Sequence, residues 1–143
     1  MIAVDTNVLV YAHRAEMPLH ARAAEGVAGL AEGRAAWAIP WPCIHEFLAV
    51  VTHPRIFDPP TPLQAAIDQV EAWMESPTLA LLGETAGHWP VLRELVSAAD
   101  VAGPRVHDAR IAALCRSHGV SRLWSVDRDF SRFPTLTTTS DFR

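Results

Sequence analysis

The chain has 143 residues, half of them hydrophobic, and a net charge of −4. This length predicts one domain with one core, residues 1–143, and the hydrophobic content excludes a disordered chain. No apolar run approaches the ~18 residues that a membrane span requires, and we expect a cytoplasmic protein without a signal peptide. Its two cysteines are expected to be buried and reduced, because disulfides are rare in that compartment.

Short β-branched or aromatic runs alternate with helical patterns along the chain. In chain order, strands are expected at residues 2–4, 35–41, 78–82, 122–126 and 136–139, and helices at residues 6–14, 20–32, 42–52, 62–75, 85–99 and 105–118. Residues 52–62 are dense in proline and should form a loop. Strands that alternate with helices of this length predict an α/β fold with a parallel sheet covered on both faces.

Two aspartates lie where predicted strands end. Asp5 follows the strand at residues 2–4, and Asp127 follows the strand at residues 122–126. Because the carboxyl ends of parallel strands lie at the same edge of a sheet, where ligands bind, we expect the two carboxylates to lie close together. Either aspartate could equally cap the helix that follows it, and this alternative stays open.

Two further acids lie inside predicted helices. Asp108 lies one turn before Ile111 and Ala112, on the apolar face of its helix, and its alternative role is to cap that helix. Glu46 lies in the middle of a helix whose residues 42–51 are apolar or small nearly all round, which predicts a buried helix. A buried glutamate needs a partner, so we expect Glu46 to face a metal or, alternatively, an arginine.

Four acids that converge repel one another and raise one another's pKa values unless a cation lies among them. Oxygen ligands alone favour Mg²⁺ or Mn²⁺ and disfavour zinc. Such ions serve phosphoryl transfer, because they lower the pKa of a bound water and stabilise negative charge on the leaving oxygen. The acids therefore predict a metal-dependent site for phosphate chemistry.

Four segments match, in order, the motifs of a known family. They are VDTNVLVYA at residues 4–12, PCIHEFLAVVTHPRIF at residues 42–57, VHDARIAALC at residues 106–115 and WSVDRDFSRFP at residues 124–134. With these motifs the chain resembles PIN-domain ribonucleases and, more narrowly, the VapC toxins of bacterial toxin–antitoxin pairs. The resemblance extends over essentially the whole chain and implies a three-layer α/β/α fold with a central parallel sheet.

The resemblance also implies an activity, the hydrolysis of RNA by a metal-dependent endoribonuclease. The catalytic acids that it implies are Asp5, Glu46, Asp108 and Asp127. All four are implied ligands of Mg²⁺ or Mn²⁺, Asp5 and Asp108 foremost, with Asp129 as a fifth acid of less defined role.

Further roles follow from the same resemblance. Thr6, Asn7 and Ser125 would support the site through hydrogen bonds, and Arg110 and Arg128 could contact RNA phosphates. The implied partners are an antitoxin, which is a small DNA-binding protein with a C-terminal tail, an RNA substrate and a second copy of the chain, and no membrane. The alternative is a non-catalytic binding module whose acidic pocket receives a basic antitoxin side chain in an autorepressor complex.

Overall fold

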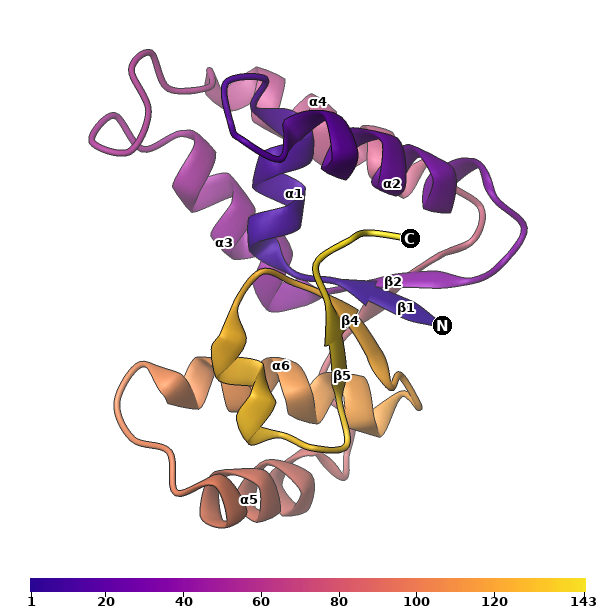
Figure 1. Ribbon diagram of the computed structural model, residues 1–143, viewed down its shortest axis with the longest axis vertical. Helices are drawn as coiled ribbons and strands as arrows, with labels where there is room; N and C mark the ends of the chain where they lie inside the picture. Colours follow the sequence, from indigo (N-terminus) through magenta and orange to yellow (C-terminus); the bar gives the residue numbers. More distant parts are fainter.

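The computed structural model describes residues 1–143 and contains a sheet of five parallel strands between two layers of helices (Figure 1). The strands are β1 Ile2–Val4, β2 Trp37–Pro40, β3 Leu79–Leu82, β4 Arg122–Trp124 and β5 Thr137–Thr139. They lie in the order β3-β2-β1-β4-β5. Ala3 of β1 lies opposite Ala38 of β2 on one side and Leu123 of β4 on the other. The expected parallel sheet is thus confirmed.

Helices α1 to α4 lie on one side of the sheet, and α5 and α6 lie on the other (Figure 1). The helices are α1 Thr6–His13, α2 His20–Glu32, α3 Trp41–Val51, α4 Leu63–Met74, α5 His88–Ala99 and α6 Arg105–Ser117, with a short 3₁₀ helix η1 at Arg128–Arg132. This arrangement confirms the three-layer α/β/α fold. None of these helices combines the length and the apolar character that crossing a membrane requires.

The hydrophobic core is one cluster of 33 buried residues. All four residues of β2 are buried, and Val4 of β1 and Leu123 of β4 have no exposed surface. Central strands of a parallel sheet are covered on both faces, which explains why their sequences are apolar without alternation. The edge strand β5 has the sequence TTT and is only partly covered.

The observed boundaries differ from the expected ones by a few residues. Helix α5 begins at His88 rather than at residue 85 and has Pro90 in its first turn, where a missing N–H is tolerated. Strand β4 ends at Trp124, so Asp127 lies in the turn before η1 rather than directly after the strand. No expected element corresponded to η1, because a single 3₁₀ turn is too short to show periodicity.

Candidate metal centre and catalytic site

Three neighbouring strands end at the edge of the sheet where the predicted acids lie. Asp5 follows β1, Ser125 follows β4, and α3, which carries Glu46, follows β2. The strand order changes direction between β1 and β4, and open α/β sheets bind ligands in such a crevice. The cavity there has a volume of about 490 Å³, and we call it the acidic cleft because its lining includes the four carboxylates of Asp5, Glu46, Asp108 and Asp127.

Asp5 is the most buried acid of the cleft, with 5% of its surface exposed. Its Oδ1 accepts a hydrogen bond from the backbone N–H of Thr6 (2.8 Å) and lies 3.6 Å from Cys43 Sγ. Its Oδ2 accepts hydrogen bonds from Ser125 Oγ (2.6 Å) and Asn7 Nδ2 (3.1 Å). Asp5 is also the N-cap of α1, so the capping role and the cleft-facing position occur together.

Burial raises the pKa of Asp5, and the negative charge of Glu46 raises it further. The hydrogen bonds from Ser125 and from the Thr6 N–H act in the opposite direction, because they stabilise the ionised carboxylate. A cation in the cleft would act in the same direction as these hydrogen bonds and favour the charged form of Asp5.

Asn7 and Ser125 join the end of β1 to the end of β4. Asn7 Nδ2 donates to Ser125 Oγ (3.2 Å), and Asn7 Oδ1 accepts from the backbone N–H of Val126 (3.3 Å). Ser125 Oγ also accepts from the backbone N–H of Asp127 (3.0 Å) while it donates to Asp5. The Ser125 hydroxyl thus uses its one donor and both acceptor sites, and it links the Asp5 carboxylate after β1 to the backbone of Asp127 in the turn after β4.

Glu46 lies at the cleft but is exposed, so the prediction of a buried helix is wrong for this face of α3. The buried face of α3 carries Cys43, Ile44 and Phe47. The exposed face of α3 also carries small and apolar residues, such as Ala49, so the sequence pattern did not indicate which face of this helix meets solvent. The alternative of a buried ion pair is also wrong, because none of the ion pairs includes Glu46, which accepts a hydrogen bond from the Thr6 hydroxyl at 3.3 Å.

Asp108, Asp127 and Asp129 come closest to forming a metal site. Each offers one carboxylate oxygen, the three oxygens lie within 4.8 Å of one another, and all three residues are half-buried. Asp108 lies in the first turn of α6 but does not cap it, since the N-cap is Pro104. Asp5 lies outside this triad, so the foremost role predicted for Asp5 and Asp108 as direct ligands stays a prediction.

The electrostatics of the cleft fit a hard cation. Burial raises the pKa of Asp108 from 3.8 to about 6, together with the charges of its acidic neighbours, which are, in decreasing order of effect, Asp127, Asp5, Asp129 and Glu46. Four neighbouring acids are therefore close enough to disfavour the ionisation of Asp108. An oxygen-only donor set of this kind suits Mg²⁺ or Mn²⁺, which would remove the repulsion.

Asp127 and Asp129 have contacts of their own. Asp127 caps η1 by accepting a hydrogen bond from the backbone N–H of Asp129 (2.8 Å), so here too capping and cleft lining coincide. The Asp129 carboxylate lies 3.9 Å from the Arg105 guanidinium. Arg105 was not predicted from the sequence as a residue of the site. Its position three residues before Asp108 places it on the same side of α6 and could have revealed it.

The two predicted RNA contacts lie near the rim of the cleft. Arg110 lines a smaller neighbouring cavity that shares Glu46 with the acidic cleft, and its guanidinium pairs with Glu84 at 2.9 Å. Arg128 is exposed at the start of η1, next to Asp127 in the chain. Their contact with RNA stays a prediction.

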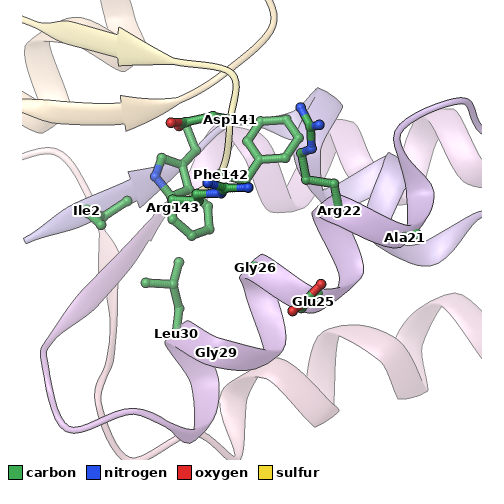
Figure 2. Close-up of a pocket in the computed structure, with 11 residues that line it drawn as sticks. Ile2, Ala21, Arg22, Glu25, Gly26, Gly29, Leu30, Asp141, Phe142 and Arg143 are labelled. Carbon is green, nitrogen blue, oxygen red and sulfur yellow. The ribbon is translucent and has the colours of Figure 1, made fainter.

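A second pocket, of about 560 Å³, lies between α2 and the C-terminal tail and shares no lining residue with the acidic cleft (Figure 2). Phe142 packs there on Gly26, and its carbonyl oxygen lies 2.8 Å from the position of a Cβ at that glycine. The charged residues drawn there are Arg22, Glu25, Asp141 and Arg143. Since acids and arginines are mixed in this pocket, the acidic cleft is the better candidate for a metal centre.

Comparison with known proteins matches residues 2–136 to the family model described as PIN domain. The chain belongs to the PIN domain family. It is 35% identical over 129 residues to Ribonuclease VapC48 of Mycobacterium tuberculosis, with 90% of this chain and 89% of the relative covered. Ribonuclease VapC43 of the same organism is 37% identical over 136 residues, with coverages of 95% and 92%. These matches confirm the resemblance to VapC ribonucleases.

The fold of this family member also resembles a solved structure. It superposes on the crystal structure of VapBC2 from Rickettsia felis bound to a DNA fragment from their promoter, with a TM-score of 0.70 and 18% identity. The superposition covers 97% of this chain and 98% of the other. At this identity the similarity supports the PIN-like fold.

Proposed function

We propose that this chain is the toxin of a toxin–antitoxin pair and a Mg²⁺- or Mn²⁺-dependent endoribonuclease that hydrolyses RNA phosphodiester bonds. Relatives named as VapC ribonucleases, matched over nearly their whole length, support this proposal. The observation that carries its catalytic part is the convergence of four acids on one cleft with Asp129 beside them. The oxygens of Asp108, Asp127 and Asp129 lie within 4.8 Å of one another.

The residues divide the work in the proposed reaction. Asp108, Asp127 and Asp129 would hold the cation, and Asp5 would face it from the end of the neighbouring strand β1. A bound divalent cation supplies a water of lowered pKa and neutralises charge on the phosphate. Ser125 holds the Asp5 carboxylate and the Asp127 backbone in fixed positions through its hydrogen bonds to both. Glu46, at the exposed side of the cleft, would orient the attacking water. Hydrolysis would leave 5′-phosphate and 3′-hydroxyl ends.

The proposal includes protein partners. A solved relative with the same fold is a VapBC2 complex with promoter DNA, which supports an antitoxin partner for this chain. A basic side chain of that antitoxin would enter the acidic cleft and block it. We also propose a homodimer, for which the exposed Trp41 and Trp89 offer apolar surface. Light scattering coupled to size-exclusion chromatography tests the dimer directly.

Cleavage of total cellular RNA by the purified, antitoxin-free protein tests the catalytic part. The reaction is run with Mg²⁺ or Mn²⁺, with EDTA, and with the variants Asp5→Asn and Asp108→Asn. Asp68→Asn is the matched control, since Asp68 is exposed on α4, outside the cleft. Circular dichroism verifies that each variant is folded.

The proposal expects discrete new 5′-phosphate ends with wild type and Asp68→Asn, and none with EDTA or the two cleft variants. If folded wild type and Asp108→Asn gave the same RNA pattern, the catalytic proposal would be wrong. If antitoxin binding were then lost in the Asp5→Asn and Asp108→Asn variants, the chain would be the non-catalytic binding module.

A further inference from the structure

The acidic cleft has a second, apolar half. On one side of the acids, its wall is formed by side chains of α1, α3 and the loops that follow them. We call this set the apolar half, and it consists of Val10, Tyr11, Met17, Val50, Ile56 and Phe57. A metal-dependent phosphate site needs no such surface, so the apolar half requires its own explanation.

Helix geometry places the apolar half next to the acids. Val10 lies four residues after Thr6 on α1, and Val50 lies four residues after Glu46 on α3. Residues at this spacing lie on the same side of a helix and about 6 Å apart along its axis. Each of the two helices therefore presents to the cleft a polar group, Thr6 or Glu46, and one turn later an aliphatic group, Val10 or Val50. A ligand fixed at the acids would therefore reach the apolar half with a group about 6 Å away from the fixed one.

The outer wall of the apolar half is held in place before any ligand binds. Phe57 is buried, and the Arg14 guanidinium stacks over its ring at 4.3 Å from the centroid. Arg14 also donates hydrogen bonds to Thr61 Oγ1 (3.1 Å) and to the Pro59 carbonyl (2.9 Å), which anchor the proline-dense loop. Ile56 extends from this anchored loop and is 53% exposed at the edge of the cleft. A preformed wall loses little conformational entropy on binding.

We propose that the apolar half binds one unpaired nucleobase of the RNA, adjacent to the phosphate held at the acids. This inference rests on the proposed ribonuclease function and adds a recognition element to it. A flat ring with two apolar faces fits between aliphatic and aromatic side chains, and RNA is commonly read through bases that leave the stack in single-stranded loops.

The chemistry of the apolar half also predicts what it selects. Its six side chains carry one hydroxyl, on Tyr11, and otherwise no oxygen or nitrogen atom. Contacts of this kind depend on the π-face that every base has rather than on hydrogen-bonding edges. The apolar half therefore selects an unpaired nucleotide at the scissile position and tolerates different bases there.

The test combines a change in the protein with a change in the RNA. The protein variants are Ile56→Ala and the matched control Leu63→Ala, whose side chain is 63% exposed at the start of α4 and lies outside the cleft. The RNA is an oligonucleotide containing a mapped cleavage position, either intact or abasic at the nucleotide before or after the scissile phosphate. For each combination kcat and KM are measured.

With wild type and Leu63→Ala, removal of one of the two bases should lower kcat/KM by about five- to 150-fold, the usual range for one stacked base. With Ile56→Ala this penalty should shrink by about threefold or more, because part of the stacking surface is absent. Ile56→Ala should cut the abasic RNA as fast as wild type does, which shows that the phosphate chemistry is intact.

Equal abasic penalties in wild type and Ile56→Ala, or no penalty at either position, would overturn the inference and leave the ribonuclease function standing. Absence of any RNA cleavage by wild type would overturn both. If Ile56→Ala had unchanged RNA kinetics but bound a partner peptide more weakly, the apolar half would be a peptide site and the inference would be wrong.

Discussion

Replacement of Asp108 by asparagine should stabilise the metal-free protein at pH 8. The pKa of the Asp108 carboxyl is raised from 3.8 to about 6, by burial first and then by the charges of the other acids in the cleft. No hydrogen bond offsets this shift. Asparagine has nearly the same shape and no charge, so the variant removes the repulsion without opening a cavity.

The direction and the size of this change in the free energy of unfolding follow from the pKa of Asp108 in the folded protein and in the unfolded chain. Between about pH 4 and pH 6 the folded protein binds more protons at Asp108 than the unfolded chain does, so the free energy of unfolding falls as the pH rises through this window. The difference between a pKa of 3.8 and one of about 6 corresponds to at most ~3 kcal/mol in the free energy of unfolding. Because the carboxyl is half-buried and solvent screens its charge, we expect about 1 kcal/mol.

Urea unfolding measures this prediction at pH 4 and pH 8, in EDTA and in excess Mg²⁺. In EDTA the Asp108→Asn variant should be about 1 kcal/mol more stable than wild type at pH 8, and the two should be nearly equal at pH 4. In Mg²⁺ the order at pH 8 should reverse, since a cation bound to the native state stabilises wild type more.

Asp68→Asn, on the surface of α4, serves as the control and should show neither effect. A variant less stable than wild type at pH 8 in EDTA would refute the reasoning. It would mean that the ionised Asp108 carboxylate has a favourable partner in the metal-free protein.

Three further predictions concern stability and reactivity. Gly26→Ala should lower the free energy of unfolding by about 1–3 kcal/mol, because the new Cβ would meet the Phe142 carbonyl oxygen at 2.8 Å. Gly29→Ala should raise the free energy of unfolding by about 0.5–1 kcal/mol, because no atom lies within 4 Å of its Cβ position and alanine favours the helix. Equal urea midpoints for the two variants would contradict this. Asp100→Gly should raise the free energy of unfolding by about 1 kcal/mol and with it the melting temperature. Asp100 ends α5 in the left-handed conformation, at φ 49°, which glycine adopts without strain. Both cysteine thiols are buried with raised pKa values, so a disulfide reagent should label them only in urea.

Much of the fold was predictable because its signals are local. The apolar runs of the central strands and the helical period of segments such as His20–Glu32 identify each element without knowledge of its neighbours. The end of β4 and the existence of η1 were not predictable in the same way. The end of β4 is fixed by Ser125, whose hydroxyl donates to Asp5 from far along the chain, which no local pattern reports. The 3₁₀ helix η1 is held by a local hydrogen bond from the Asp129 N–H to Asp127, but one turn is too short to show periodicity.

The positions of the acids at the cleft were predictable from the sequence, but their exposure and their contacts were not. Asp5 could be placed because the end of a parallel strand fixes which edge of the sheet it meets. Glu46 was placed at the cleft, but its exposure was mispredicted, since apolar residues such as Ala49 also occur on a solvent face. The pairing of Asp129 with Arg105 joins η1 to α6 and requires the tertiary structure.

The exposure of the acids bears on how one cleft could serve both catalysis and inhibition. Asp5 is fixed by four contacts, while Asp108, Asp127 and Asp129 are half-buried and Glu46 is exposed. The neighbouring negative charges disfavour the ionised forms of Asp5 and Asp108, and a cation in the cleft would relieve this repulsion. A divalent metal brings two charges, and a guanidinium brings one charge with five donors. If both relieve the same repulsion, the antitoxin arginine and the metal that we propose would compete for one set of oxygens, so the acids proposed to make the enzyme active would also make it inhibitable.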